Sequence, residues 1–294
     1  MYDIVIVGAG PAGLSAAITA RARGKEVLVI SNKPEHNPLA KSSLVDNYPG
    51  IEAVTGSELL KKMLAHADTL GARFLYARVI SVLPRGPQHF ALTTSGDYIE
   101  TKSVILTPGT TTTTVAYPGE QEHLGHGVSY CATCDGMLYR NATVCVVGSS
   151  PDAVEEANFL AGIGATVIYL AKTPPQGLYA GIKVYAGTVK AIKGDTQGVT
   201  AVIFAEKTRQ TSGKPGLLTI PCKGVFILRH TIAPRALLGG LTFADGYIVV
   251  DAQMRTAVEG VFAAGDCVGK PLQIAKAVGD GQRAFFAAVE YLAN

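Results

Sequence analysis

The chain repeats part of its own sequence after 140 positions, and no other feature constrains its fold as strongly. Residues 7–13 align without a gap with residues 147–153, and the further matches are Ala17, Gly24 and Val27 with Ala157, Gly164 and Val167. Each copy contains a short apolar run, a tight turn, a stretch with helical spacing, a glycine and a second apolar run. This order is typical of the βαβ unit that binds dinucleotides, and a register kept over about thirty residues favours a genuine repeat.

The segments outside the two copies predict how the rest of the chain is organised. Between the copies we expect an amphipathic helix and then a β-meander, at residues 57–70 and at residues 72–83, 90–94 and 97–106. After the second copy we expect short strands and then a return crossing, near residues 184–193, 199–205, 217–221 and 225–228 and at residues 234–244. Residues 247–250 and 261–266 would then rebuild the first sheet, and a long helix follows at residues 272–292.

The predicted fold is α/β, with two Rossmann-like, three-layer ββα nucleotide-binding domains, the second inserted into the first. We place the first domain at residues 1–113 and 244–294 and the second at residues 114–243. The threonines at 110–114 are a candidate linker between them, and a short strand is the alternative. A chain of 294 residues that is 48% hydrophobic is long and apolar enough for two cores.

Charge and hydropathy exclude several classes of partner. The net charge is +3 with dispersed Lys and Arg, which indicates no nucleic-acid surface. The apolar run at residues 4–7 is far too short to span a bilayer, so we expect no membrane partner. The N-terminus lacks the pattern of a signal peptide, so we expect a cytoplasmic protein.

A glycine motif in the first copy predicts a dinucleotide site. Gly8, Gly10 and Gly13 follow a strand and open a helix, so they suit a tight turn, a close approach to a pyrophosphate, and helix–strand packing. The helix N-terminus would supply free N–H groups to the phosphates, and the alternative is a purely structural turn. Asp266 ends a late strand, where it would bind a cofactor hydroxyl or cap the next helix.

Cys131 and Cys134 form a Cys-x-x-Cys motif between the two nucleotide folds, followed directly by Asp135. Such a pair can form a disulfide that exchanges with the disulfide of another molecule through a mixed disulfide. A nearby carboxyl group can supply or accept the proton of a cysteine thiol. A zinc site with His123 and His126 is an alternative, but the four-residue gap is short for a tetrahedral site. We therefore predict a redox pair and no metal, an inert pair being the remaining alternative. The three other cysteines (Cys145, Cys222 and Cys267) lie in or beside apolar segments and are predicted to be buried, inert thiols.

The chain resembles the low-molecular-weight thioredoxin reductases, which are flavoprotein disulfide reductases, at residues 8–13, 47–50, 127–136 and 260–266. The resemblance implies FAD in the first domain, a homodimer, and a domain rotation that offers the cysteine pair alternately to flavin and to thioredoxin. It implies that Cys134 faces the flavin, Cys131 attacks the partner disulfide, and Asp135 is the proton donor. The predicted cofactor-binding residues are Gly8, Gly10, Pro11, Ala12, Gly13, Asn47, Gly109, Asp266, Gln273 and Ile274.

The second copy departs from the pattern of this family. Ser150 stands where the second glycine belongs, and its Cβ would crowd a pyrophosphate; Ala153 at the third position is tolerable. Where the family has a His-Arg-Arg cluster for a 2′-phosphate, residues 171–175 offer Lys172 as the one cation. The absence of an acidic residue there also argues against a site for NADH. We therefore expect the second domain to keep the fold without binding a nucleotide.

The residues expected around the predicted flavin also depart from the pattern of this family. Residues 36–38 correspond roughly to a Gly-Gly-Gln segment of the family, and Leu272 replaces an Arg. These changes resemble an atypical branch without NADPH binding, which includes the ferredoxin-dependent flavin thioredoxin reductases. We therefore predict a flavoprotein thioredoxin-disulfide reductase whose donor is reduced ferredoxin. The alternatives are an NAD(P)H-dependent reductase with a divergent site, a flavin-dependent oxidase of small dithiols, and a flavin redox sensor that is not an enzyme.

Overall fold

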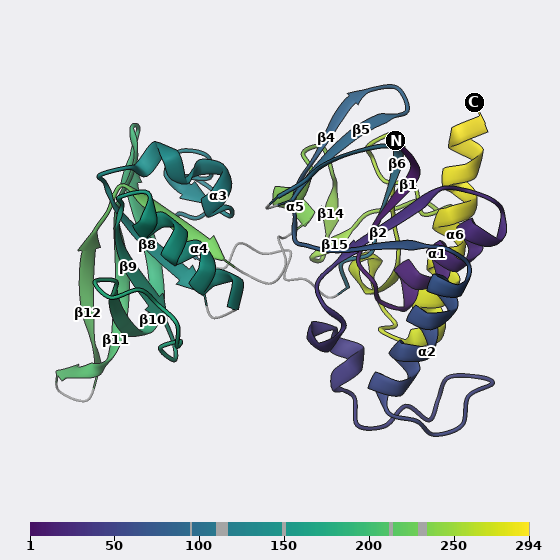
Figure 1. Cartoon of the computed structure of the whole chain (residues 1–294), viewed down its shortest axis with the longest axis horizontal. Helices are drawn as coiled ribbons and strands as arrows, with labels where there is room; N and C mark the ends of the chain where they lie inside the picture. The colour runs from purple at the N-terminus through teal and green to yellow at the C-terminus, as the bar shows by residue number, and fades with distance from the viewer. Residues whose placement is uncertain (95, 110–116, 149–150, 212–213, 229–233, 294) are drawn as a thin grey trace. The chain divides into compact units, whose positions relative to one another are not determined.

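Two compact units make up the computed structural model, which describes residues 1–94, 96–109, 117–148, 151–211, 214–228 and 234–293. The first unit combines Met1–Thr113 with Thr231–Asn294, and the second is Thr114–His230, so the second interrupts the first along the chain (Figure 1). The chain returns to the first unit earlier than residue 244, because helix α5 (Pro234–Leu237) already packs against a strand of that unit. The threonines at 110–114 and Ser150 lie outside the described residues.

A seven-stranded sheet forms the centre of the first unit, in the order β3-β2-β1-β6-β5-β4 with β16 also paired to β6. Its strands are β1 (Tyr2–Val7), β2 (Val27–Ser31), β3 (Arg73–Tyr76), β4 (Val79–Gly86), β5 (His89–Thr94), β6 (Tyr98–Leu106) and β16 (Val261–Ala263). The pairs of β1, β2, β3, β6 and β16 are parallel, whereas β4 and β5 join through antiparallel pairs. The central strands are nearly continuous buried apolar runs, as expected of a sheet covered on both faces.

Three helices share one core with alternate residues of β1 and β2. They are α1 (Pro11–Ala22), α2 (Gly56–Thr69) and α6 (Ile274–Ala293), and the short 3-10 turns of this unit are η1 (Pro34–His36), η2 (Pro38–Lys41) and η4 (Gly265–Val268). Helix α2 begins with a capping box, because Thr55 and Glu58 bond each other's backbone N–H groups. Helices α1 and α6 approach closely at Gly281, where a Cβ would lie 2.0 Å from the carbonyl oxygen of Ala12. This contact holds the beginning of α1 against the first half of α6.

The second unit has its own seven-stranded sheet, in the order β12-β11-β10-β9-β8-β13-β7. Its strands are β7 (Val128–Ser129), β8 (Thr143–Gly148), β9 (Thr166–Ala171), β10 (Lys183–Asp195), β11 (Gly198–Thr211), β12 (Lys214–Pro221) and β13 (Gly224–Leu228). Its helical elements are α3 (Ala132–Asp135), η3 (Gly136–Tyr139) and α4 (Pro151–Gly162). Strands β7, β13, β8, β9 and β10 pair in parallel, and β10, β11 and β12 form an antiparallel extension.

The structure confirms the repeat and the predicted fold class. Helices α1 and α4 have the same length and are offset by 140 positions. The strand registers carry the same offset, because Ile4 pairs with Val27 in the first unit and Val144 with Val167 in the second. Each unit therefore contains a βαβ element of the kind that the sequence predicts.

Two strand assignments are corrected by the structure. Residues 72–83 are two strands, because β3 joins the parallel edge beside β2 while β4 alone belongs to the meander. Residues 247–250 do not extend the first sheet, because β15 (Tyr247–Ile248) pairs with β14 (Phe243–Ala244) in a separate two-stranded ribbon. Short apolar runs leave the pairing partner undetermined, since the same run can join either edge of a sheet or a ribbon.

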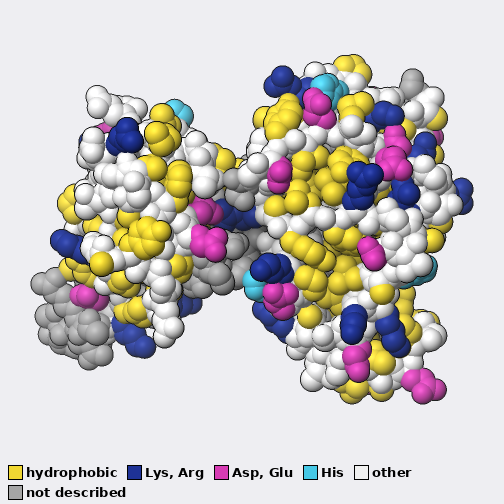
Figure 2. All heavy atoms as spheres, viewed as in Figure 1, with side chains coloured by type: hydrophobic (Ala, Val, Ile, Leu, Met, Phe, Trp, Pro, Cys, Tyr) yellow, Lys and Arg dark blue, Asp and Glu magenta, His cyan; other side chains and the backbone are white. Residues whose placement is uncertain are grey.

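The charged side chains on the described surface are dispersed, as the sequence predicts. On the face that Figure 2 shows, Lys and Arg side chains lie among Asp, Glu and apolar side chains. No described helix is both long and apolar enough to cross a bilayer.

Candidate functional site

Two glycines of the motif after β1 are required by the packing of the protein itself. Gly8 has φ +117°, and a Cβ there would lie 2.2 Å from the carbonyl oxygen of Thr107. A Cβ at Gly13 would lie 2.0 Å from the carbonyl oxygen of Gly8. The hydroxyl of Thr107 donates to the carbonyl oxygens of Val7 and Gly8 at 3.0 Å, which fixes the turn against β6. The turn is therefore tight for structural reasons.

Gly10 has no such structural reason to be glycine. It caps α1 with φ −84° and ψ −177°, a conformation open to any residue, and a Cβ there would meet no atom within 4 Å. The N-terminus of α1 carries no side-chain cap and no acidic residue in its first turn, and Pro11 and Ala12 begin the helix. The missing Cβ leaves open space beside free N–H groups, which fits the pyrophosphate of a dinucleotide.

The segment at residues 36–38 contacts this turn directly. Asn37 donates its side-chain N–H to the carbonyl oxygen of Ala9 at 3.0 Å, and its Oδ1 accepts the N–H of Leu39 at 3.0 Å. The same side chain therefore starts η2 and holds the glycine turn. The sequence shows that this segment is unusual, but the contact across 28 positions has no sequence signal.

The structure brings two predicted cofactor residues together from distant parts of the chain. Asn47 donates its amide N–H to Oε1 of Gln273 at 2.9 Å, and both side chains are exposed. Ile274 follows as the first residue of α6, and Gly109 lies just after β6 with φ +74°. Predicted residues from three segments thus lie on the first unit, and two of them, Asn47 and Gln273, bond each other at its surface.

The loop that carries Asp266 packs against the start of α1. A Cβ at Gly265 would lie 2.9 Å from Cβ of Ala12, so η4 sits against the glycine turn. Asp266 is half-buried at this loop. The carboxyl end of β16, the turn after β1 and the first turn of α6 therefore converge, as in folds that bind a dinucleotide at strand ends.

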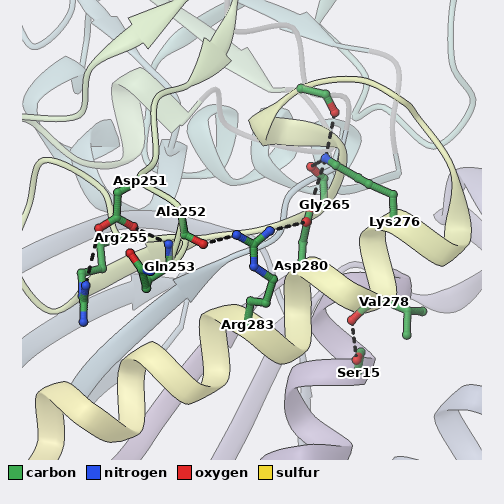
Figure 3. A network of polar contacts seen from close by, with 11 residues as sticks. Ser15, Asp251, Ala252, Gln253, Arg255, Gly265, Lys276, Val278, Asp280 and Arg283 are labelled. Atoms are coloured by element: carbon green, nitrogen blue, oxygen red, sulfur yellow. Dashed lines mark hydrogen bonds and ion pairs between the residues drawn. The ribbon is translucent and has the colours of Figure 1, made fainter.

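Lys276 ties this loop to helix α6, a role that the sequence analysis missed (Figure 3). Its ammonium donates to the carbonyl oxygens of Gly265 and Gly269 at 2.7 and 2.8 Å and pairs with Oδ2 of Asp280 at 2.9 Å. Arg283 lies near the other oxygen of Asp280 and donates to the carbonyl oxygen of Ala252. The one sequence signal is a lysine in the first turn of a helix, where the helix dipole disfavours a cation.

Burial raises the pKa of Asp266 above its ordinary value, Lys276 opposes the rise, and Asp280 adds to it. A carboxyl with a raised folded-state pKa favours its neutral form, so its contribution to stability is present at low pH and is lost as pH rises through that pKa. At neutral pH the ionised Asp266 therefore destabilises the protein without its ligand. Retaining such a residue is typical of a site that binds a ligand.

We expect Asp266→Asn to separate stability from cofactor binding. The ligand-free variant should unfold at a higher temperature than the wild type at pH 7, and this difference should vanish toward pH 4 (thermal unfolding followed by circular dichroism). Its affinity for FAD, the cofactor that the sequence predicts, should fall by about tenfold or more, because a hydrogen bond to a charged group is lost. Asp245→Asn, on an exposed turn of the same unit, should change neither property. A variant that binds FAD as tightly as the wild type would remove Asp266 from the site.

In the second unit, Cys131 and Cys134 are joined in a disulfide with Cα atoms 5.4 Å apart. Cys131 caps α3, and its sulfur accepts the backbone N–H of Cys134 at 3.1 Å and lies 3.3 Å from the hydroxyl of Thr133. Cys131 is 1% exposed, whereas Cys134 is exposed. Among the described residues, no group of three or more His, Cys, Asp or Glu side chains is placed to hold a metal ion.

Ser129 links Asp135 to the cysteine pair, which the sequence analysis did not foresee. Its hydroxyl donates to Oδ2 of Asp135 at 2.6 Å and accepts the N–H of Cys131 at 3.1 Å. Asp135 therefore lies one hydroxyl away from the backbone of Cys131. This geometry can move a proton near the pair and also fixes the start of α3.

The remaining cysteines are buried free thiols, as predicted. Burial raises the pKa of Cys267 to about 12. A hydrogen bond with the Cys222 thiol and burial raise the pKa of Cys145 as well. Thiols of this kind are poor nucleophiles, because the thiolate is the reactive form.

Gly148, at the end of β8, differs from its counterpart Gly8 at the end of β1. Gly148 does not share the left-handed φ of Gly8, and a Cβ there would lie 2.7 Å from Cβ of Ala153. The loop after β9 folds back onto α4, where Asn158 bonds the carbonyl oxygen of Gly177 and the N–H of Tyr179, each at 2.8 Å. The second copy therefore keeps the βαβ element, but its first glycine does not have the left-handed φ of Gly8.

Comparisons with known proteins agree with this geometry. The family model for pyridine nucleotide-disulphide oxidoreductases matches residues 2–281. A thioredoxin reductase of Listeria innocua is 32% identical over 295 residues, which cover 96% of this chain and 91% of that protein. The crystal structure of a ferredoxin-flavin thioredoxin reductase from Clostridium acetobutylicum is 36% identical, with a TM-score of 0.86, and the match covers 99% of this chain and 98% of that chain. A thioredoxin reductase from Gloeobacter violaceus is 31% identical, with a TM-score of 0.81 and coverage of 99% and 94%.

Proposed function

The chain belongs to the pyridine nucleotide-disulphide oxidoreductase family as a thioredoxin reductase, and we propose that it uses FAD and takes electrons from reduced ferredoxin. The observation that carries the proposal is the contrast between the two βαβ copies. The first has an open space at Gly10 beside a free helix N-terminus. In the second, Gly148 does not have the left-handed φ of Gly8, and the sequence has Ser150 in place of the second glycine. We infer one working dinucleotide site, on the first unit, and a second fold that only carries the disulfide.

The first unit offers the contacts that FAD needs. The N-terminus of α1 would face the pyrophosphate, while Asp266, Asn47 and Gln273 would bond its polar groups. FAD, when bound, supplies the ability to collect single electrons into the pair that a disulfide requires. Lys276 holds the Asp266 loop on α6, and Asn37 holds the glycine turn. These residues orient the cofactor and take no part in the exchange with thioredoxin.

The second unit would carry the disulfide exchange. Two electrons and two protons open the bond between Cys131 and Cys134, and the exposed position of Cys134 supports its role as the sulfur that faces the flavin. The Cys131 thiolate, stabilised by the N–H of Cys134, would attack a thioredoxin disulfide and release one partner thiolate. Cys134 then attacks the mixed disulfide and releases the second partner thiolate. Asp135 would supply a proton through the Ser129 hydroxyl.

Ferredoxin as donor rests on the altered second copy and on the similarity to a ferredoxin-flavin thioredoxin reductase. Lys172 is exposed at the end of β9, where a nicotinamide cofactor with a 2′-phosphate would need several cations. A ferredoxin needs no such cluster, because it docks on a surface and passes single electrons to the flavin. We also propose a homodimer, in keeping with the family resemblance.

A donor assay tests the proposal. We expect that the anaerobically purified protein loses the visible absorbance of its flavin within seconds of adding reduced ferredoxin. Micromolar NADPH or NADH should leave that absorbance unchanged over the same time, while an NADPH-dependent thioredoxin reductase serves as positive control. Adding thioredoxin should restore the oxidised spectrum and produce one thioredoxin dithiol for every two electrons supplied.

The same assay separates the alternatives. Rapid bleaching by NADPH would show a divergent but working nucleotide site, and in that case Lys172→Glu should raise the NADPH concentration needed. Oxygen consumption with small dithiols and no reduction of thioredoxin would identify an oxidase. A single reduction without turnover would identify a sensor.

A further inference from the structure

A buried carboxyl group reaches the redox helix from the neighbouring helix α4. Glu156 is 7% exposed, and its Oε2 accepts the backbone N–H of Ala132 at 2.6 Å. Ala132 is fully buried and stands directly between Cys131 and the rest of α3. The contact is as short as hydrogen bonds to ionised acceptors usually are.

The free N–H groups at the start of α3 are divided between two acceptors. The N–H of Ala132 points to Glu156, while that of Cys134 points to the sulfur of Cys131. Glu156 therefore satisfies a donor that a helix start leaves free. Its ionised form would also place a negative charge next to the residue that follows Cys131, in an interior where charges are weakly screened.

The charge acts differently on the two redox states of the pair. The disulfide is neutral, whereas the reduced pair carries negative charge whenever one sulfur is a thiolate. A buried carboxylate beside Cys131 therefore disfavours the reduced form and leaves the oxidised form unchanged. Removing that charge while keeping the hydrogen-bond acceptor should make the pair easier to reduce.

We propose that Glu156 is a positioning residue that sets the redox equilibrium of Cys131 and Cys134 and makes their dithiol a stronger reductant. A strongly reducing dithiol suits an enzyme that passes electrons on to another protein disulfide. The inference rests on the proposed function of the pair as the site of disulfide exchange. It assigns a role to a buried side chain that acts on the pair through the backbone of α3.

The equilibrium with glutathione measures this role. Two glutathione thiols give two electrons and two protons, the Cys131–Cys134 bond breaks, glutathione disulfide forms, and each cysteine sulfur takes up one of the protons. Holoprotein equilibrated anaerobically in glutathione buffers is quenched with acid, denatured and alkylated. Since the chain has five cysteines and one disulfide, mass spectrometry will find five labels on reduced protein and three on oxidised protein.

For Glu156→Gln, we expect the equilibrium constant to shift about tenfold toward the dithiol, which corresponds to a reduction potential about 30 mV higher. Glu156→Ala should shift it in the same direction and provides a second test if the amide is not tolerated. Glu155→Gln is the matched control, because it removes the same charge from an exposed position one residue away and should leave the equilibrium unchanged.

The inference is overturned if Glu156→Gln folds with the wild-type unfolding temperature and shows the same equilibrium constant as Glu155→Gln. A shift toward the disulfide would overturn it as well, because the sign would then be opposite to that of a repelled thiolate. The assay uses neither ferredoxin nor thioredoxin, because glutathione supplies the electrons. A protein that fails to reduce thioredoxin but shows the expected shift would therefore refute the proposed function alone.

Discussion

Cys134→Ser should stop thioredoxin reduction, lowering the turnover rate at least ~1,000-fold, as expected when one member of a catalytic unit is removed. Without Cys134, the pair cannot store two electrons as a dithiol, and nothing resolves the adduct that Cys131 forms with thioredoxin. The variant should therefore form a covalent complex with thioredoxin that survives denaturing electrophoresis. A reducing agent should release it.

Two variants make this result specific. Cys131→Ser should be equally inactive but should form no complex, because the attacking sulfur is gone. Cys222→Ala removes a buried free thiol from the same unit and should retain turnover. The structure makes the comparison necessary, since Cys131 is 1% exposed and Cys134 is the exposed member of the pair. If Cys131→Ser formed the complex and Cys134→Ser did not, Cys134 would be the sulfur that attacks thioredoxin and Cys131 the one that resolves the mixed disulfide.

The fold was largely predictable because its signal is local and occurs twice. The apolar runs, the helical spacing and the glycine stops lie within about thirty residues, and the second copy repeats them at one constant offset. Helices α1 and α4 start and end at that offset, and the strand registers follow it. What failed was the choice of partner for short strands, since β3 and β15 have compositions that suit several edges.

The contacts that build the site were harder to predict because they join distant segments. Asn37 and Ala9 are 28 positions apart, and Ala132 and Glu156 are 24 positions apart. No spacing rule connects such pairs, since the intervening strands and turns decide whether they meet. The sequence named the residues that belong to motifs but could not name the side chains, Glu156 and Lys276, that hold those motifs in place.

The glycine motif after β1 shows the same limit of prediction from sequence. The sequence does not distinguish Gly8, Gly10 and Gly13, yet the structure requires glycine at only two of these three positions. Gly8 and Gly13 avoid collisions within the protein, whereas the space beside Gly10 holds no protein atom within 4 Å. Only Gly10 can therefore be tested as a ligand contact without disturbing the fold.

Gly10→Val should weaken FAD binding by about a hundredfold while leaving the flavin-free protein folded. The added side chain would fill the space beside the α1 N-terminus, where about two charge-assisted hydrogen bonds to the pyrophosphate, each worth roughly 1.5 kcal/mol, would be lost. The backbone at Gly10 already has extended angles, so valine adds no conformational strain. Titration of the flavin-free protein with FAD, followed by flavin fluorescence, measures the change.

Gly13→Ala and Gly96→Val are the matched comparisons. A Cβ at Gly13 would strike the carbonyl oxygen of Gly8, so this variant should lower the unfolding temperature of the flavin-free protein itself. Gly96 is an exposed glycine with equal open space, and its replacement by valine should change neither stability nor affinity. If Gly10→Val bound FAD like the wild type, the open space would not hold the pyrophosphate. If flavin-free Gly10→Val had an unfolding temperature as low as that of Gly13→Ala, Gly10 would be required for packing. Its weaker FAD binding would then not identify a ligand contact.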